Sequence, residues 1–482
     1  MSESYRVPGV YVEEDNALAL SIQQGETAVP VFVGHFNAIV STTSIKCLAI
    51  ESWLDFTKKF NVSEVVDVDL KTEIATFTPH VGSHSVRLYF ENGGGPCYVL
   101  HLNDRSHETL EGMVAAIDKT PDITLLVWCE HVNEDDTIYN RLAKLLGNTA
   151  SPIGSRGIFM LVDAQLDKGD CTKFTVPDVC KDNENVAAYF PALASQYGRV
   201  YDEKSVNLKE LDDLDELLEV ANGDNHSDAI NTLHDLKVIC DNFGADKGAS
   251  DEKKDAMEEI IKLYDKCRVV VNSTLANRPV YIRASAAVAG VMARVDRDRG
   301  VWKAPANVVL SGVTDLVAYF TGPANGEGWK SIRVTDTMNE KMVDAGINAI
   351  RYFSGQGVTV YGTRTMSNPK NNDWLYVPVR RLFNAVERDT RTALRSVIFE
   401  PNSAVTWDKI RCTLDNYLYG LWKKGALQGD KPAQAYYVQV GRGITMTQDD
   451  INKGRMIVKI GLSAVRPAEF IVLQLTQDMR AG

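Results

Sequence analysis

The stretch WLYVPVRRLFNAVERDT, residues 374–390, opens the part of the chain whose local signals agree best with one another. From Leu375 to Val397 the apolar residues recur mostly at steps of three and four, which is the period of an amphipathic helix. These residues are Leu375, Val379, Leu382, Phe383, Val386, Leu394 and Val397. The sequence therefore predicts one helix here.

A second helix is predicted directly after the first. Pro401 disfavours helical angles at Glu400, and Asn402 or Ser403 offers a side-chain oxygen as an N-cap. One face then carries Trp407, Ile410, Leu414, Tyr417, Leu418 and Leu421, and the opposite side carries Asp408, Lys409, Asp415, Asn416, Tyr419 and Lys423. Gly425 and Gly429 end this helix.

The same region resembles the C-terminal signature of contractile tail sheath proteins, which build myophage tails, phage-tail-like injection particles and tailocins. The segments that carry the resemblance are WLYVPVRRLFNAVERDT (374–390), VIFEPNSAVTWDKI (397–410) and LYGLWKKGALQGDKPAQAYYV (418–438). Further similar segments, in the order of that family, are RVPGVYVEE (6–14), YFENGGGPCYVL (89–100), RDRGVWKAPAN (297–307) and GVTVYGTRT (357–365).

The bulk composition limits the classes of protein to consider. A chain of 482 residues predicts two or three domains. It contains no run of about 18 uncharged apolar residues, and MSESYRVPG lacks the features of a secretory signal, so we expect cytoplasmic synthesis and no membrane insertion. The eight cysteines form no CxxC motif, and we expect neither a zinc site nor a cofactor.

The acidic charge is local. Residues 202–266 hold 19 Asp and Glu against 8 Lys, a net charge of −11 out of −12 for the whole chain. A nearly neutral remainder argues against direct binding of nucleic acid, which needs a basic surface.

Strands and helices alternate between residues 29 and 163, which predicts an α/β fold with a largely parallel sheet covered on both faces. The predicted strands are Val29 to Gly34, Val86 to Phe90, Cys97 to Leu102, Ile123 to Cys129 and Gly157 to Asp163; the predicted helices are Leu110 to Ile117 and Ile138 to Leu146. The resemblance implies a subtilisin-like α/β central domain.

We expect four parts in the chain. They are an N-terminal arm (1–25), the α/β region (26–365), a C-terminal α+β sheath domain (366–466) and a C-terminal arm (467–482). An acidic helical insertion is expected at about 165–270, with helices at Leu208 to Val220, Asp228 to Asn242 and Asp251 to Lys266, followed by a strand at Val269 to Val271. We interpret it as an outward-facing decoration, with contact to a host or partner as the alternative.

In the family that the chain resembles, the two arms of neighbouring subunits add strands to the sheet of a third. The resemblance therefore implies strand donation by Val7, Pro8, Gly9, Val10, Tyr11 and Val12 and by Phe470, Ile471, Val472 and Leu473. It implies strand reception by Tyr436, Tyr437, Val438, Ile457, Val458 and Ile460. The second helix is expected to contact an inner tube protein through Lys409, Asp415, Lys423 and Lys424, with plain solvent exposure as the alternative.

No constellation with a distinguishing catalytic spacing is present, so we do not expect an enzyme. His80 and His84 are four apart, but Pro79 and Gly82 favour a loop without a metal. The expected function is that of a structural subunit in a contractile sheath, a helical homo-oligomer with a baseplate and a terminator or cap protein as further partners. The alternatives are a type VI secretion sheath component and, more distantly, an enzyme of another class.

Overall fold

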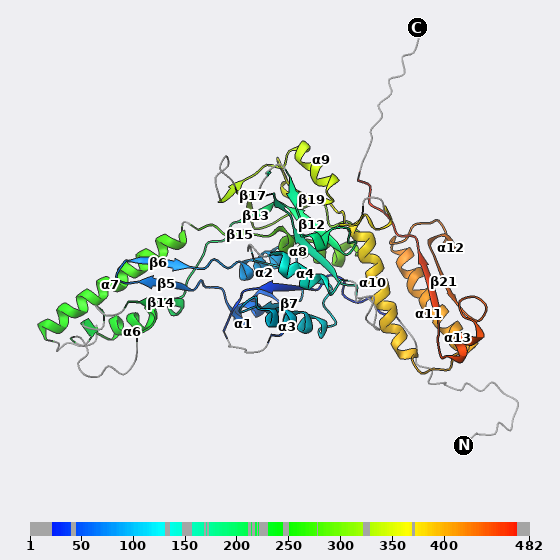
Figure 1. Ribbon diagram of the computed structural model, residues 1–482, viewed down its shortest axis with the longest axis horizontal. Coiled ribbons are helices and arrows are strands. Elements are labelled where there is room, and N and C mark those ends of the chain that lie inside the picture. The colour runs from blue at the N-terminus through cyan, green and yellow to red at the C-terminus, as the bar shows by residue number, and fades with distance from the viewer. Residues whose placement is uncertain are drawn as a thin grey trace, which may run out of the picture. The chain divides into compact units, whose positions relative to one another are not determined.

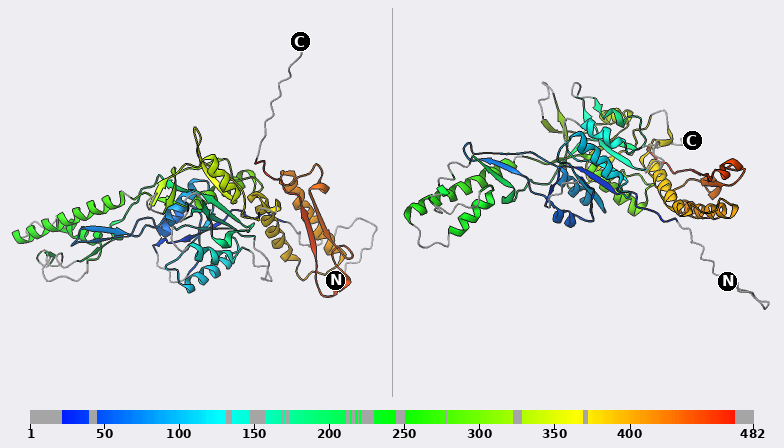
Figure 2. Two further views of the ribbon diagram at one scale, coloured as in Figure 1. Left: turned by 45° about the horizontal axis from the view of Figure 1, so that its top comes forward. Right: turned by 60° about the horizontal axis from the view of Figure 1, so that its bottom comes forward.

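The computed structural model describes residues 22–39, 45–130, 135–146, 157–167, 170, 173–210, 214, 217–218, 220, 230–243, 250–276, 278–321, 328–368 and 372–469. These residues form two compact units (Figures 1 and 2). The α/β unit holds residues 26–384 and 466–469, and the C-terminal unit holds 22–25 and 385–465. The chain thus passes from one unit to the other within α10 (Val377–Leu394). The predicted sheath domain has the bounds 366–466, and these bounds remain a prediction.

A nine-stranded sheet forms the centre of the α/β unit. Its order is β16 (Val308–Val309), β20 (Gly357–Tyr361), β19 (Ile347–Phe353), β12 (Val186–Phe190), β9 (Phe159–Asp163), β8 (Leu125–Trp128), β1 (Pro30–Gly34), β7 (Cys97–His101) and β3 (Leu48–Ile50). From β19 to β7 all neighbours are parallel, and the outer strands β20, β16 and β3 are antiparallel. The predicted largely parallel sheet is confirmed.

Helices cover both faces of this sheet, because its strands are apolar on both sides. In β1, Phe32 faces a core shared with α2 (Gly82–Glu91) and α8 (Ala284–Arg299). Its neighbours Val31 and Val33 face the opposite core. That core includes α3 (His107–Asp118), α4 (Asp135–Ala143) and α9 (Asp336–Asp344). The α/β class is therefore established, while the subtilisin-like topology stays a prediction.

Shorter elements complete the α/β unit. They are α1 (Trp53–Lys59), the pair β2 (Asn37–Ala38) and β4 (Phe60–Asn61), the pair β10 (Gln165–Leu166) and β11 (Phe174–Thr175), and a sheet of β15 (Tyr281–Ile282), β13 (Ala192–Ser195), β17 (Val313–Phe320) and β18 (Gly328–Ser331).

The strand expected at Val86 to Phe90 is wrong, because these residues belong to helix α2. The buried Glu130, two residues after the end of β8, explains why a helix forms here. Its Oε2 accepts a hydrogen bond from the backbone N–H of Val81 (3.3 Å), and its Oε1 accepts one from Gly82 (3.2 Å). These N–H groups begin a helix and have no partner inside it, so a carboxylate distant in sequence stabilises the helical state.

The acidic region forms a separate layer built on a three-stranded sheet. The sheet order is β14 (Val206–Lys209), β5 (Val66–Asp69) and β6 (Ile74–Phe77), and the helices are α6 (Leu233–Phe243) and α7 (Asp251–Ala276). Figure 1 shows α7 alongside β5 and β6. Their shared core, which includes Val68, Leu208 and Ile260, is distinct from the two cores of the central sheet.

Three expectations for the acidic region need correction. The region is not one insertion at 165–270, since residues 66–77 contribute two of its strands and residues 186–195 belong to the sheets of the body. Leu208 lies in β14 and not in a helix. Val269 to Val271 continue α7, because Cys267, Val271 and Leu275 repeat every four residues on its buried face.

The C-terminal unit contains the end of α10, α11 (Ala404–Lys423), α12 (Pro432–Ala435), β21 (Tyr436–Val440), α13 (Gln448–Asn452) and β22 (Val458–Leu462). The two predicted long helices are confirmed. The stripe expected to be buried on α11 is buried at Ile410, Leu414, Leu418 and Leu421. The unit is therefore of the predicted α+β type.

Candidate assembly site on the C-terminal unit

The strands expected to receive the arms of neighbours form an antiparallel hairpin, β21 and β22. Tyr436, Tyr437 and Val438 lie in β21, and Val458 and Ile460 lie in β22. The register places Val438 opposite Ile460 and Val440 opposite Val458. Ile457 precedes β22, and its carbonyl oxygen accepts a hydrogen bond from Thr445 Oγ1 (2.7 Å). Apart from Ile457, the residues lie in strands as predicted.

Helix α11 packs against the hairpin through β21. Tyr436 and Val440 are buried and Tyr437 is 54% exposed, which is the alternation of a strand with one covered face. The Tyr436 hydroxyl donates to the backbone oxygen of Asp415 on α11 (3.4 Å). Burial, with the nearby Asp415 carboxylate, raises the pKa of Tyr436 to about 12, so the hydroxyl keeps its proton.

The uncovered face has a close contact between the two strands. Tyr437 lies opposite Gly461, and its ring occupies the space that a Cβ on Gly461 would need. Gly461 therefore permits the ring to lie flat against β22, where it covers backbone that glycine would leave bare.

One hydrogen bond at the end of the hairpin shows which of its cross-strand pairs are hydrogen-bonded and which are not. The Ser463 N–H donates to the Ala435 oxygen (2.8 Å), which makes Tyr436 and Leu462 a non-hydrogen-bonded pair. Because pairs alternate along an antiparallel ladder, Tyr437 and Gly461 exchange both of their bonds. The backbone groups that point away from the partner strand therefore belong to Tyr436, Val438, Val440, Val458, Ile460 and Leu462, and the Tyr436 N–H donates to the Pro432 oxygen of α12.

Both outer edges of the hairpin are open in the part of the chain that the structure describes. The sheet there has two strands, and the outward N–H and C=O groups of Val438, Val440, Val458, Ile460 and Leu462 have no backbone partner among the described residues. An open edge is a template for another extended chain. One edge lies on β21 and the other on β22, so two further strands fit.

The four residues expected to contact a tube are all exposed. Lys409, Asp415 and Lys423 lie on α11, and Lys424 is its C-cap. The Lys423 ammonium lies 5.2 Å from the centre of the Tyr419 ring. The Lys424 ammonium donates to Gln24 Oε1 (2.8 Å). Lys424 therefore already has a partner within its own chain.

Apolar and thiol groups also belong to this outer side of α11. Val405 is 79% exposed, Tyr419 is 38% exposed, and Cys412 is an exposed free cysteine. Spacings of seven residues place all three on one helical face. The sequence analysis identified the charges on this side and missed Val405 and Cys412, although the same helical period places them there.

The donated strands lie outside the described residues. This holds for Val7 to Val12 and for Phe470 to Leu473. Of the expected assembly residues, the structure thus describes the receiving hairpin and the helix beneath it.

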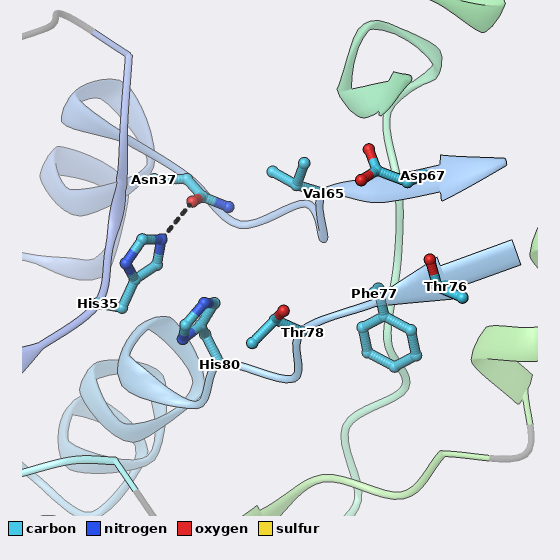
Figure 3. Close-up of a pocket in the computed structure, with 8 residues that line it drawn as sticks. All are labelled: His35, Asn37, Val65, Asp67, Thr76, Phe77, Thr78 and His80. Carbon is cyan, nitrogen blue, oxygen red and sulfur yellow. Dashed lines mark hydrogen bonds between the residues drawn. The ribbon is translucent and has the colours of Figure 1, made fainter. Parts of the chain in front are cut away.

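A pocket of about 380 Å³ lies in the α/β unit, at the carboxyl end of β1 (Figure 3). His35, Asn37 and His80 lie on one side of it, and Asp67, Thr76 and Phe77 lie on the other. The stacked rings of His35 and His80 have centroids 3.8 Å apart, and the His101 ring lies 4.9 Å from that of His35. The pocket thus separates the central sheet from strands β5 and β6.

Burial, and the neighbouring His80 and His101, lower the pKa of His35, and burial lowers the pKa of His101. His35 and His101 are therefore more readily neutral near pH 7 than free histidines. Across the described ranges, His, Cys, Asp and Glu side chains form no group of three that could bind a metal ion. His84, expected in a loop, lies in the first turns of α2.

Among the described helices, none is both long and apolar enough to span a bilayer.

Comparison with known proteins identifies similarity over parts of the chain first. The family model of the phage tail sheath C-terminal domain matches residues 369–478. The tail sheath protein of Vibrio phage KVP40 is 24% identical over 140 residues, which cover 29% of this chain. The match spans about a fifth of that protein, 19% of its length.

Solved structures extend the similarity to the whole chain. The helical sheath of the anti-feeding prophage in its contracted state is 33% identical with a TM-score of 0.67, covering 98% of this chain and 100% of that one. The contracted PVC sheath complex of an extracellular contractile injection system is 31% identical with a TM-score of 0.62, covering 99% of each chain. With identities above 30% over almost the full length of both chains, the protein belongs to the contractile tail sheath family.

Proposed function

We propose that this protein is the structural subunit of a contractile sheath, which polymerises helically around an inner tube and contracts to drive the tube through a target envelope. The full-length similarity to sheaths in contracted states supports this function. That similarity also favours a phage-tail-like injection particle over a phage tail, because the match to the phage protein covers a smaller part of the chain.

The observation that carries the proposal is the hairpin with two open edges. Val438 and Val440 present backbone groups on one edge, and Val458, Ile460 and Leu462 present them on the other. The N-terminal arm of one neighbour and the C-terminal arm of another would each add a strand, giving four strands from three subunits. Backbone bonds hold such a joint while subunits rotate as rigid bodies.

The outer side of α11 is proposed to contact the inner tube protein. Exposed charges such as Lys409 and Lys423 give weak, salt-sensitive contacts, which suit a tube that must slide when the sheath contracts. Baseplate and terminator proteins would complete the particle at its two ends. No step of this function requires catalysis.

The first test is deletion of residues 1–15. A folded monomer that does not form tubes is expected, as judged by circular dichroism and negative-stain electron microscopy. Normal tubes from the shortened chain would refute strand donation by the N-terminal arm.

The second test addresses the receiving edge. Ile460→Pro removes an outward N–H from β22, and proline is tolerated where the N–H of an edge strand faces solvent. We expect a folded subunit with impaired polymerisation. The matched control is Ile460→Val, which keeps the N–H and should polymerise. Equal polymerisation of the two variants would contradict reception at this edge.

A further inference from the structure

The segment that connects the N-terminal arm to the body, residues 22–25, is held by two hydrogen bonds within the C-terminal unit. The Gly25 N–H donates to Asp389 Oδ1 on α10 (3.2 Å). The Lys424 ammonium at the end of α11 donates to Gln24 Oε1 (2.8 Å). The attachment point of the arm is therefore fixed to the two long helices of this unit.

Asp389 is a buried carboxylate, with only 6% of its surface exposed. A buried charge is unfavourable unless it is hydrogen-bonded. Both of its oxygens are engaged, since Oδ2 accepts from the Tyr417 hydroxyl of α11 (2.8 Å). One side chain thus links the arm segment, α10 and α11.

Asp389 also leaves little space around Gly25. A Cβ at Gly25 would lie 3.1 Å from Asp389 Oδ1 and 3.8 Å from Arg388 Nε. Any other L-residue at position 25 would therefore press on the carboxylate that holds it, and glycine allows the backbone to approach closely.

A second anchor follows within the α/β unit. The Thr27 hydroxyl donates to Asp296 Oδ2 (2.5 Å), and Arg381 Nη2 donates to the Thr27 carbonyl oxygen (3.1 Å). Gly25 and Thr27 are thus held by different units, with the change of unit between Gly25 and Glu26. Only Glu26 separates these two anchored residues along the chain.

We propose that Asp389 is a positioning residue for strand donation, which fixes the origin of the N-terminal arm on the unit that also carries the receiving hairpin β21 and β22. This inference rests on the proposed function. The segment that leads to the arm and the receiving hairpin then belong to the same unit in every copy. Asp389 would act through Gly25 and would not touch the neighbouring subunit.

The test uses the full-length protein with Asp389→Ala, and hydrogen exchange at the peptide that contains Gly25 is the main readout. Loss of a hydrogen bond to a buried carboxylate should speed exchange of the Gly25 amide by about tenfold or more. Tubes should become shorter or irregular under conditions where the unaltered protein forms regular ones. Asp389→Asn retains a carbonyl oxygen of the same size, and it should restore both the slow exchange and regular assembly.

Tyr417→Phe is the matched control, because it removes the bond to Oδ2 and leaves the bond to Gly25. It should keep slow exchange at Gly25. Unaltered Gly25 exchange in Asp389→Ala, or equal acceleration in Tyr417→Phe, would overturn the proposal.

Deletion of residues 1–21 separates this proposal from the proposed function. If the deleted chain forms normal tubes, strand donation by the N-terminal arm is wrong. If the deletion abolishes tubes while Asp389→Ala forms regular tubes with unaltered Gly25 exchange, strand donation stands and the role of Asp389 is wrong.

Discussion

The ring of Tyr437 lies against the backbone of Gly461 on the uncovered face of the β21–β22 hairpin. A branched side chain at position 461 would displace this ring, because a Cβ there overlaps it. Cross-strand pairs of this kind contribute about 0.2–1 kcal/mol, so Gly461→Val should lower the free energy of unfolding of the C-terminal unit by about 1 kcal/mol.

Denaturant unfolding monitored by hydrogen exchange of the hairpin amides measures this change in the free energy of unfolding. Lys459→Val is the control, since Lys459 is exposed on the same face of β22 without an overlapping ring. Equal effects of the two substitutions would contradict a specific role for the Tyr437 contact.

Charge reversal on α11 tests the tube contact. Lys423→Glu with Lys424→Glu should weaken assembly around the tube by no more than about tenfold, because exposed ion pairs contribute only about 0–1 kcal/mol each. The defect should shrink as salt concentration rises. Co-sedimentation with the tube protein at two salt concentrations measures it.

The control for this charge reversal is Lys431→Glu, at another exposed lysine of the same unit. Unchanged co-sedimentation of the double variant would contradict the tube contact and would mean that these lysines are simply exposed to solvent. Because Lys424 also bonds Gln24, Lys423→Glu alone distinguishes tube contact from a change at the arm.

His35 and His101 predict a loss of stability in acid. The pKa of His35 and that of His101 are lowered in the fold, so the unfolded chain binds protons more readily below pH 6.5. The free energy of unfolding should therefore fall as the pH drops from about 6.5 through the lowered pKa values. Protonation at Nδ1 would also remove the acceptor that His101 offers to the Phe36 N–H (2.9 Å).

His80 and His101 oppose a charge on His35, whereas Glu130 and the Asn37 side chain favour one. His35→Gln should make thermal unfolding less sensitive to pH between 7 and 5. His107→Gln, at an exposed histidine at the start of α3, is the control and should preserve the sensitivity. Identical pH profiles for the two variants would contradict this assignment.

The ion pair of Arg381 and Asp296 should be a sensitive charged contact in the α/β unit. The Nη2 to Oδ2 distance is 2.6 Å, and both side chains are almost fully buried. Removing one partner leaves an uncompensated buried charge, so Arg381→Met should destabilise the protein by about 3–5 kcal/mol. Adding Asp296→Asn should recover part of the loss.

The comparison is the exposed pair of Arg411 and Asp408, where Arg411→Met should cost at most about 1 kcal/mol. Urea unfolding of the three variants provides the measurement. A loss below about 1 kcal/mol for Arg381→Met would show that solvent screens the buried pair.

Local periodicity predicted the C-terminal unit well because its elements are stabilised by their own pattern. The stripes of α10 and α11 are regular, and the run Tyr436 to Val440 coincides with β21. The sequence pattern could not predict which backbone groups lie on the open edges. That assignment depends on the hydrogen bond between Ser463 and Ala435, which only the structure shows. The origin of the arm depends likewise on contacts between residues 364 positions apart.

The errors occur where tertiary contacts override local preference. Val86 to Phe90 have strand propensity, yet they lie in a helix whose first N–H groups, at Val81 and Gly82, donate to Glu130. Val269 to Val271 are β-branched, yet the core of the acidic region stabilises them in α7. Residues 66–77 and 206–209 lie far apart in sequence, so their joint sheet could not be predicted from either alone.

The two open edges of the hairpin also bear on how a finished sheath stops growing. In a sheath whose subunits are joined by strand exchange, every interior copy has both hairpin edges paired with strands of its neighbours. Unpaired edges then remain only in the last ring at each end. Their number is then set by the circumference and is the same for a short sheath and a long one. A small, fixed set of terminal proteins that supply or accept one strand per protomer would therefore suffice at any length.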